Sequence, residues 1–146
     1  MRVSEILNNK GSAVVSLPPT ASLLQAAALM KRETVGAILI RNSRGQVLGV
    51  LSERDLAVAI AELGHNIFSY PVGELMSASV PTAKPGDSVR DVMRIMTERR
   101  ARHIPVVDAG DVVGIISIGD VLKSRLDEQS QENAVLHDMA RAHLAA

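Results

Sequence analysis

The stretch Gly49-Val-Leu-Ser-Glu-Arg-Asp55 returns later in the chain as Gly114-Ile-Ile-Ser-Ile-Gly-Asp120. Both copies read glycine, two apolar residues, serine, two further residues and aspartate. Branched apolar residues are typical of a buried strand, and a serine followed three residues later by an acid is typical of a helix N-terminus. Each stretch therefore predicts a strand that runs directly into a helix.

The match between the copies extends outward from these stretches, in one order and with one gap at a glycine-containing turn. Residues 3–7 also resemble residues 72–76. An ordered match of this kind indicates an internal duplication. The aligned identities include Pro19 with Pro85, Ser22 with Ser88, Met30 with Met96, and Ile38 with Ile104.

Each copy predicts the same order of elements, β-α-β-β-α. The fold class is therefore α+β, a mixed α and β fold in which two repeats pack with pseudo-two-fold symmetry. A repeat of about 60 residues is marginally stable alone, and pairing supplies the missing core. The predicted segments in the first and second copies are a helical turn at 3–8 and 72–77, a strand at 13–16 and 80–83, a helix from Ser22 and Ser88, a hairpin at 37–51 and 103–116, and a helix from Ser52 and Ser117.

These boundaries divide the chain into four parts. We assign the first repeat to residues 1–63, a linker to 64–71, the second repeat to 72–128 and a helical tail to 129–146. The residues after Asp120 contain neither proline nor glycine as far as about Ala142, so the final helix is expected to extend well beyond its repeat.

The composition argues against several classes of function. Lysine plus arginine and aspartate plus glutamate each number 16, so the net charge is zero, and binding to nucleic acid is not expected. The chain has no cysteine and four histidines without metal-ligand spacing, so no metal site is expected. No apolar run approaches the ~20 residues of a membrane helix, and no signal peptide is apparent. We expect a soluble, cytoplasmic protein that does not bind membranes.

The repeated motif carries groups that suit a nucleotide. Its glycine permits close approach of another backbone. Ser52 and Ser117 stand at helix starts, where free N–H groups and the helix dipole attract an anion such as phosphate. Asp55 and Asp120 can accept hydrogen bonds from both hydroxyls of a ribose. The branched apolar residues between glycine and serine would flank a flat base.

A simpler interpretation of the same motif stays open. Ser-x-x-Asp is also an ordinary capping box, as at Ser88 and Asp91. A duplication copies a cap as readily as a binding site. Under this alternative, the chain is a ligandless protein–protein interaction module.

With these motifs the chain resembles the family of CBS domains, the cystathionine-β-synthase repeats whose tandem pairs form a Bateman module. The resemblance covers residues 1–128 and rests on the two motif copies, the repeat order and the Arg-His-Ile-Pro-Val strand at 102–106. It implies a stand-alone regulatory or sensor module, not an enzyme, that acts on an unknown protein target. The implied ligand, bound in a cleft between the repeats, is AMP, ADP, ATP, a NAD-type dinucleotide or S-adenosylmethionine, and no cofactor is required.

The resemblance also implies which residues would bind that ligand. The ribose would be held by two aspartates and two serines, the base framed by polar and apolar strand residues, and the phosphate met by basic groups. The implied set is Asp55, Asp120, Ser52 and Ser117 around ribose and phosphate, Ser16 and Thr82 beside the base, Ile38, Leu51, Ile104, Pro105 and Ile116 as the apolar part, and Arg102, His103 and Arg54 as the basic part.

The two copies differ where charge matters. The second has Arg102-His103 where the first has Gly36-Ala37, and Arg54 is the basic residue that the first copy offers instead. Because the basic pair belongs to the second copy, we expect unequal clefts, with Asp120 contributing more to binding than Asp55.

Two other patterns have a functional and a plainer interpretation. His103, Ser117 and Asp120 could form a hydrolase triad, but Ala37 replaces the histidine in the first copy and a capping serine uses its oxygen on backbone N–H groups. This third interpretation is therefore disfavoured. The run Arg99-Arg100-Ala101-Arg102 is either a solvated helix end or a phosphate contact.

A homodimer is expected from an excess of apolar helical residues over what one small core can cover. The tail helix is expected to rest on a neighbouring subunit or on a partner protein, because isolated helices gain most of their stability from packing. The apolar residues assigned to the dimer face are Val92, Met93, Met96, Val121 and Leu122.

Overall fold

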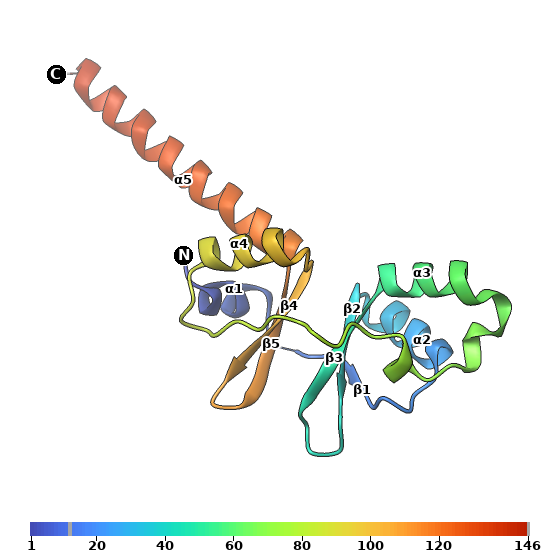
Figure 1. Cartoon of the computed structure of the whole chain (residues 1–146). Coiled ribbons are helices and arrows are strands. Elements are labelled where there is room, and N and C mark those ends of the chain that lie inside the picture. Colours follow the sequence, from blue (N-terminus) through green and yellow to red (C-terminus); the bar gives the residue numbers. More distant parts are fainter. Residues whose placement is uncertain (12, 146) are drawn as a thin grey trace.

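The computed structural model describes residues 1–11 and 13–145 and consists of two halves that lie side by side, each built on a β-hairpin (Figure 1). A long final helix projects away from the second half. The predicted fold class is confirmed: helices and strands are mixed, the repeats pack together, and the C-terminal helix is extended.

The first half is a three-stranded sheet with helices against it. Strand β1 pairs parallel with β2, and β2 pairs antiparallel with β3. The sequence placed the first strand at 13–16, whereas the observed strand is Ser16–Leu17. In chain order, the elements of residues 1–69 are α1 (Val3–Lys10), which packs against the second half, β1 (Ser16–Leu17), α2 (Leu23–Glu33), β2 (Ala37–Arg41), β3 (Val47–Ser52), α3 (Glu53–Leu63) and the 3-10 helix η1 (Gly64–Ser69).

The second half repeats this plan with a two-stranded sheet, β4-β5. The strand predicted at 80–83 is reduced to a single bridge between Ala83 and Val106, since Pro81 and Pro85 on either side lack the N–H that a longer ladder needs. The helical turn predicted at 72–77 is shorter. In chain order, the remaining elements are the 3-10 helix η2 (Val72–Glu74), which packs against the first half, α4 (Val89–Arg99), β4 (His103–Asp108), β5 (Asp111–Ser117) and α5 (Ile118–Ala145).

Serine caps begin the four helices for which they were predicted. In each case the hydroxyl oxygen accepts the backbone N–H three residues on: Ser22 from Gln25, Ser52 from Asp55, Ser88 from Asp91 and Ser117 from Asp120. The reciprocal contact predicted at Asp91 is not formed, because the Asp91 carboxylate accepts from Arg94 at 2.7 Å instead.

The opening segments of the two repeats, helix α1 and the 3-10 helix η2, each pack against the other repeat. The Val3 nitrogen donates to the Asp87 carbonyl at 2.9 Å, and its repeat counterpart, the Val72 nitrogen, donates to the Ala21 carbonyl at 2.8 Å. Helix α1 thus contributes Val3, Ile6 and Leu7 to the core of the second half, and η2 contributes Val72 to the core of the first. The chain crosses between the halves twice, which ties them into one unit.

The motif glycines lie where these exchanged segments approach the strands. A Cβ atom on Gly49 would lie 2.5 Å from the Ser77 carbonyl oxygen, and one on Gly114 would lie 2.6 Å from Cδ2 of Leu7. The close backbone approach expected of the motif glycines is therefore made by the chain itself.

The two sheets meet through the faces that point away from their own cores. Along β2 and β3, neighbouring side chains alternate between the core and the other half, as a strand requires. Ile38, Ile40 and Leu51 fill the first core, whereas Leu39 and Val50 belong to the cluster that joins the halves. The cluster also contains Ala37, Val14, Val47, Val80, Val112 and Ile115.

Helix α5 continues far beyond its repeat, as predicted, and its side chains from Gln131 to His143 are exposed. Part of the proposed dimer face is wrong, because Val92, Met96 and Val121 are buried in the second core. Leu122 is 53% exposed. Among the described residues, no helix combines the length and hydropathy needed to cross a bilayer.

Candidate functional site

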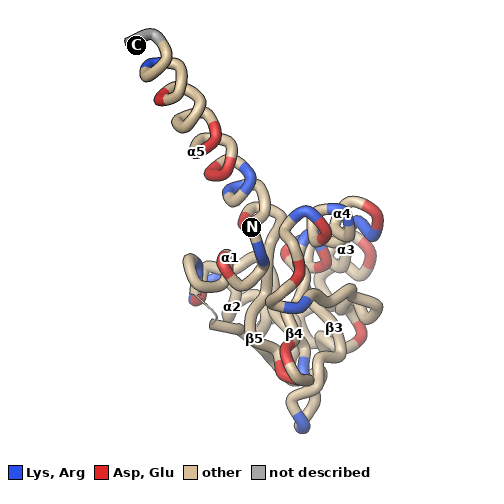
Figure 2. Tube along the Cα trace, turned by 90° about the vertical axis from the view of Figure 1, so that its left-hand side faces the viewer, with Lys and Arg blue, Asp and Glu red and all other residues tan. Residues whose placement is uncertain are grey.

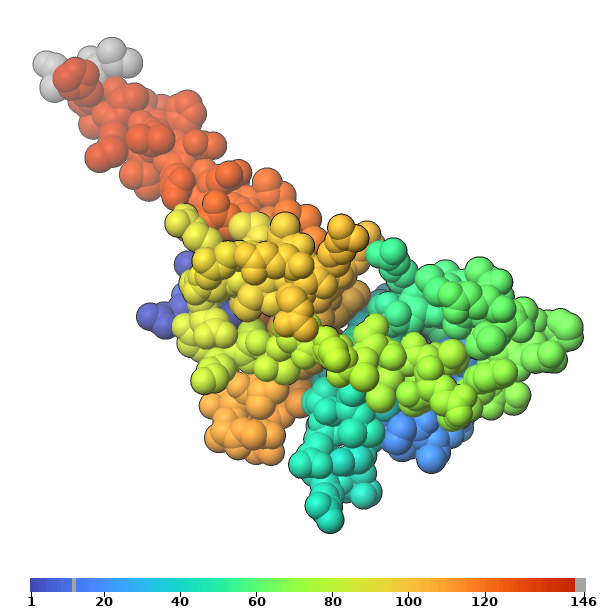
Figure 3. Space-filling view, viewed as in Figure 1, coloured from blue at the N-terminus to red at the C-terminus, as the bar shows by residue number. Residues whose placement is uncertain are grey.

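A cavity of about 420 Å³ lies where the two halves meet. Its volume falls in the range of small-molecule sites, about 300–1,000 Å³, and the space-filling view is hollowed at this place (Figure 3). It is lined by the end of β3 and the start of α3, by the segment before α4, and by the segment between α4 and β4. The lining residues are Gly36, Val50, Ser52, Glu53, Arg54, Asp55, Ser77, Ser79, Val80, Pro81, Arg99, Arg100, Ala101, Arg102 and His103.

One wall of the cavity is the first motif copy. Oδ2 of Asp55 accepts hydrogen bonds from the Ser52 nitrogen at 2.8 Å and from the Ser52 hydroxyl at 3.0 Å. The capping interpretation is therefore confirmed for this motif. The cap uses only one of the two carboxylate oxygens, since Oδ1 of Asp55 makes no hydrogen bond to a described residue. Asp55 is half-buried and lines the cavity, so this oxygen remains available to a ligand.

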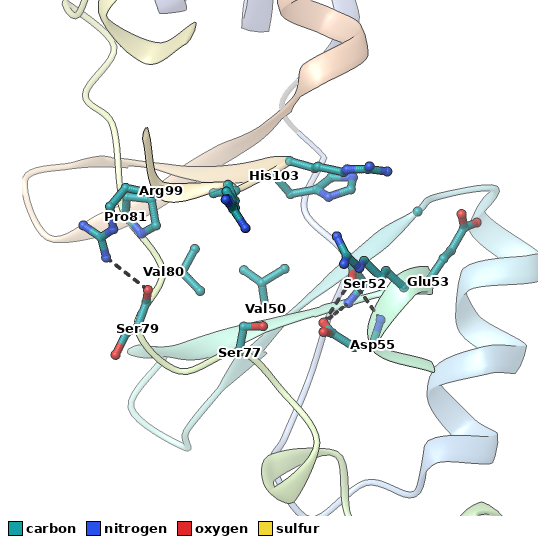
Figure 4. A pocket seen from close by; sticks show the side chains of 15 residues that line it. Val50, Ser52, Glu53, Asp55, Ser77, Ser79, Val80, Pro81, Arg99 and His103 are labelled. Carbon is teal, nitrogen blue, oxygen red and sulfur yellow. Dashed lines mark hydrogen bonds between the residues drawn. The ribbon is translucent and has the colours of Figure 1, made fainter. Parts of the chain in front are cut away.

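The opposite wall is basic. Helix α4 ends at Arg99, and the C-cap residue Arg100 has a left-handed φ of 52°, after which the chain turns toward β4. The Arg99 guanidinium donates to the Ser79 carbonyl at 3.4 Å (Figure 4). Arg102 and Arg54 also line the cavity. In Figure 2, α4 and α3 carry Lys and Arg together with Asp and Glu, and further charged residues lie along α5. Of the two interpretations of the run 99–102, its position at the cavity favours a phosphate contact.

The basic pair lies close to both motif copies. Arg102 and His103 line the cavity beside Asp55, and His103 also pairs with Ser117 of the second motif, near enough to Asp120 for that carboxylate to raise its pKa. The reason is that the start of β4 faces the end of β3 across the meeting of the halves. The stronger cleft is therefore expected at Asp55, contrary to the expectation from the sequence.

His103 is not a ready source of positive charge. Burial is the largest influence on its pKa and, together with the positive charge of Lys10, lowers it below its ordinary value of 6.5, although Asp120 and Glu53 act in the opposite direction. The lowered pKa favours the uncharged imidazole, which offers one donor and one acceptor. In the ligand-free protein this shift disfavours the positive charge that the resemblance implied for His103.

The apolar lining differs from the set expected. Ile38, Leu51, Ile104 and Ile116 are fully buried in the two cores, and Pro105 is also buried outside the cavity lining. The side chains between the two walls are Val50 and Val80 (Figure 4). Strand alternation explains the difference, since Leu51 and its neighbour Val50 point to opposite faces.

Two residues expected beside the base do not line the cavity. Ser16 and Thr82 are exposed and do not line the cavity. Their expected position is taken by Ser77, Ser79 and Pro81, which the sequence did not single out. No pattern marked these residues, because they belong to an irregular segment whose course is set by packing.

The second motif copy has a different environment. Oδ2 of Asp120 accepts from the Ser117 nitrogen at 2.9 Å and from the Lys10 ammonium at 2.6 Å. Burial alone would raise the pKa of Asp120, but the hydrogen bonds from Lys10 and Ser117 hold it below its ordinary value. The Ser117 hydroxyl accepts the Asp120 N–H at 3.2 Å, so it serves as a cap.

Comparison with known proteins gives a consistent result. A family model described as "CBS domain" matches the chain twice, over residues 3–62 and 72–127. The chain is 29% identical over 133 residues to "CBS domain-containing protein YhcV" of Bacillus subtilis (strain 168), a match that covers 91% of this chain and 94% of that protein. The crystal structure of the CBS-domain containing protein ATU1752 from Agrobacterium tumefaciens superposes with a TM-score of 0.83 at 37% identity, covering 86% of this chain and 99% of that one.

Two similar structures contain adenosine compounds. CBS domain protein PAE2072 from Pyrobaculum aerophilum, complexed with AMP, has a TM-score of 0.73 and 28% identity, with 82% of this chain and 89% of that chain covered. The CBS domain pair of protein MJ0100, in complex with 5'-methylthioadenosine and S-adenosyl-L-methionine, has a TM-score of 0.76 and 26% identity, with 89% and 98% covered.

Proposed function

We propose that this chain, which belongs to the CBS-domain family, is a regulatory module that binds an adenine nucleotide in the cavity beside Asp55. The observation that carries the proposal is the combination, in one cavity, of a carboxylate with a free oxygen, two apolar side chains and an arginine-rich wall. The ligands of PAE2072 and MJ0100 support the class of compound.

Each part of a nucleotide has a matching surface. The free oxygen of Asp55 is suited to accept from ribose hydroxyls, because a carboxylate has acceptor sites on both oxygens. Val50 and Val80 offer apolar contact to the faces of a base. Arg99, Arg100 and Arg102 are suited to phosphate, since guanidinium groups bind its oxygens through paired hydrogen bonds.

The charge of the wall favours phosphorylated ligands over S-adenosylmethionine. A sulfonium cation placed beside several guanidinium groups is repelled, and a phosphate in the same place is attracted. Affinity is therefore expected to rise from adenosine to AMP and further to ADP and ATP, with NAD as an additional phosphorylated ligand to compare.

Calorimetry and thermal shift with adenosine, AMP, ADP, ATP, NAD and S-adenosylmethionine test the proposal. A ligand at 100 times its dissociation constant should add about 2.7 kcal/mol to the free energy of unfolding. No heat and no shift with any of them at millimolar concentration would refute nucleotide binding.

The ligandless interaction module remains the alternative. It is favoured by one observation: both Ser-x-x-Asp motifs form caps, so each has a structural role without any ligand. Under this alternative, Asp55→Ala destabilises the fold and the wild-type chain binds none of the six compounds.

A further inference from the structure

The two motif aspartates differ in one contact. The Lys10 ammonium donates to Oδ2 of Asp120 at 2.6 Å and to the Ile115 carbonyl at 2.9 Å. Ile115 is the repeat counterpart of Val50, which lines the cavity in the first half. Asp55 has no cationic partner among the described residues. Lys10 therefore pairs with Oδ2 of Asp120, the oxygen that also accepts from the Ser117 nitrogen, whereas the counterpart oxygen of Asp55 accepts only from Ser52.

The exchange of opening segments brings Lys10 to this position. Helix α1 packs into the second core and ends at Lys10, where Gly11 caps it with a φ of 91°. By the alignment of the opening segments, the counterpart of Lys10 is Ser79. Ser79 lines the cavity of the first half and carries no charge. One residue difference between the repeats thus leaves one aspartate free and neutralises the other.

We propose that the Lys10 side chain occupies the second cleft beside Asp120, and that it thereby limits the chain to one bound nucleotide. The inference rests on the proposed function, since it concerns the second copy of the same kind of site. A ribose that bound Asp120 would have to displace an ammonium held by two acceptors, one of them charged. Charge-assisted hydrogen bonds of this kind are about twice as strong as those that neutral hydroxyls make.

Removal of the lysine should open a second site with a different preference. The basic run 99–103 of the first cleft corresponds to Glu-Thr-Val-Gly-Ala at 33–37 of the other repeat, which contains no basic residue. The opened site should therefore bind adenosine and AMP about equally, because it lacks the basic side chains that would bind a phosphate. The first site should prefer AMP.

The test is titration calorimetry of the full chain with adenosine and with AMP. We expect one site in the wild type and two in Lys10→Ala, the additional one lost again in Lys10→Ala/Asp120→Ala. Lys31→Ala, a change at an exposed lysine on α2, is the matched control and should keep one site. Circular dichroism of each variant verifies that the chain is folded.

The outcomes separate the inference from the proposed function. Two sites in the wild type, or one site in both the wild type and Lys10→Ala, would overturn the role of Lys10 while nucleotide binding stands. No site in the wild type would overturn the proposed function. In that case, binding that appears in Lys10→Ala and is lost again in Lys10→Ala/Asp120→Ala would still support the role of Lys10. If Lys10→Ala also binds no nucleotide, the role of Lys10 would be overturned too.

Discussion

Oδ2 of Asp55 accepts hydrogen bonds from both the nitrogen and the hydroxyl of Ser52, at 2.8 and 3.0 Å, so a helix cap and a candidate ligand group share one carboxylate. The two roles can be separated because the second repeat has the same cap. Asp55→Ala and Asp120→Ala remove equivalent capping partners, but only the first removes a group that lines the cavity.

We therefore predict that Asp55→Ala weakens AMP binding by about 1.5–3 kcal/mol, the typical contribution of a hydrogen bond to a charged group, or roughly tenfold to a hundredfold. Asp120→Ala should leave the affinity within a factor of about three while lowering thermal stability at least as much as Asp55→Ala, because it also removes the ion-pair partner of Lys10. Calorimetry and melting curves measure both quantities. An equal or greater loss of affinity in Asp120→Ala would contradict the assignment of the cleft.

Arg102→Gln tests the basic wall. The change keeps a polar side chain but removes the charge, so the loss of affinity should grow with ligand charge, from little for adenosine to about tenfold or more for ATP. Arg44→Gln, at the exposed tip of the β2-β3 hairpin, is the control. Added salt should weaken ATP binding to the wild type more than to Arg102→Gln. A uniform loss across the ligands would argue against phosphate contact.

The lowered pKa of His103 makes binding depend on pH. In the free protein, burial and Lys10 favour the uncharged ring, with Arg102 acting in the same direction and Asp120 and Glu53 against it. A bound phosphate raises the pKa, so binding takes up a proton between the two pKa values. The affinity of the wild type, relative to His103→Gln, should therefore rise as pH falls through that interval. Parallel pH profiles for the two proteins would show that His103 is not coupled to the ligand.

Gly49→Ala should destabilise the fold. The new Cβ would lie 2.5 Å from the Ser77 carbonyl oxygen, and the backbone bridge between Val50 and Ser77 leaves that oxygen little room to move. Overpacking of this kind typically costs about 1–3 kcal/mol. Gly119→Ala is the control, since its Cβ meets only the Ser117 hydroxyl at 3.6 Å, and it should raise stability by up to about 1 kcal/mol through helix propensity. Denaturant unfolding compares the two.

The start of α5 is proposed as part of a homodimer interface. Ile118, Leu122 and Leu126 follow one another at helical spacing and are 43%, 53% and 63% exposed. Such a stripe is stabilised when a second copy covers it. Sedimentation should therefore give a species of twice the 15.6 kDa chain mass. Leu122→Glu/Leu126→Glu should shift it to the monomer.

Leu24→Glu, a change at an exposed residue of α2, should leave the dimer intact. Truncation after Glu128 tests the tail separately. An unchanged dimer and melting temperature would show that the tail makes no contact across the interface. A wild-type monomer at micromolar concentration would remove the proposal altogether.

The sequence predicted local structure well because the signals were local. The serine caps and the hairpins follow from residues within four positions of one another, and their repetition reinforced each assignment. The site was predicted less well, since its composition depends on which face of a strand each residue occupies. Leu51 and Val50 illustrate this point: the pattern identified both as strand residues, and only the packing of the halves decided which one lines the cavity.

Contacts between residues far apart in the chain could not be predicted from the sequence pattern. Nothing near Lys10 indicates that it will meet Asp120, because the contact arises from the docking of α1 into the other repeat. The position of Arg102 and His103 beside Asp55 has a different origin, since it arises where the start of β4 faces the end of β3 across the two halves. Both features depend on contacts between the repeats, which the pattern within each repeat does not indicate.

The exchanged opening segments also determine the order in which the two cores can form during synthesis. Val72 follows the first half closely, so that half can close its core soon after it leaves the ribosome. Helix α1 emerges earlier, but its partners Ile104, Ile116 and Val121 are made near the end. At about 5–20 residues per second, its apolar face waits on the order of ten seconds. A nascent chain that stops before β5 therefore leaves the apolar residues Val3, Ile6 and Leu7 uncovered, and exposed apolar surface of this kind makes an incomplete chain prone to aggregation.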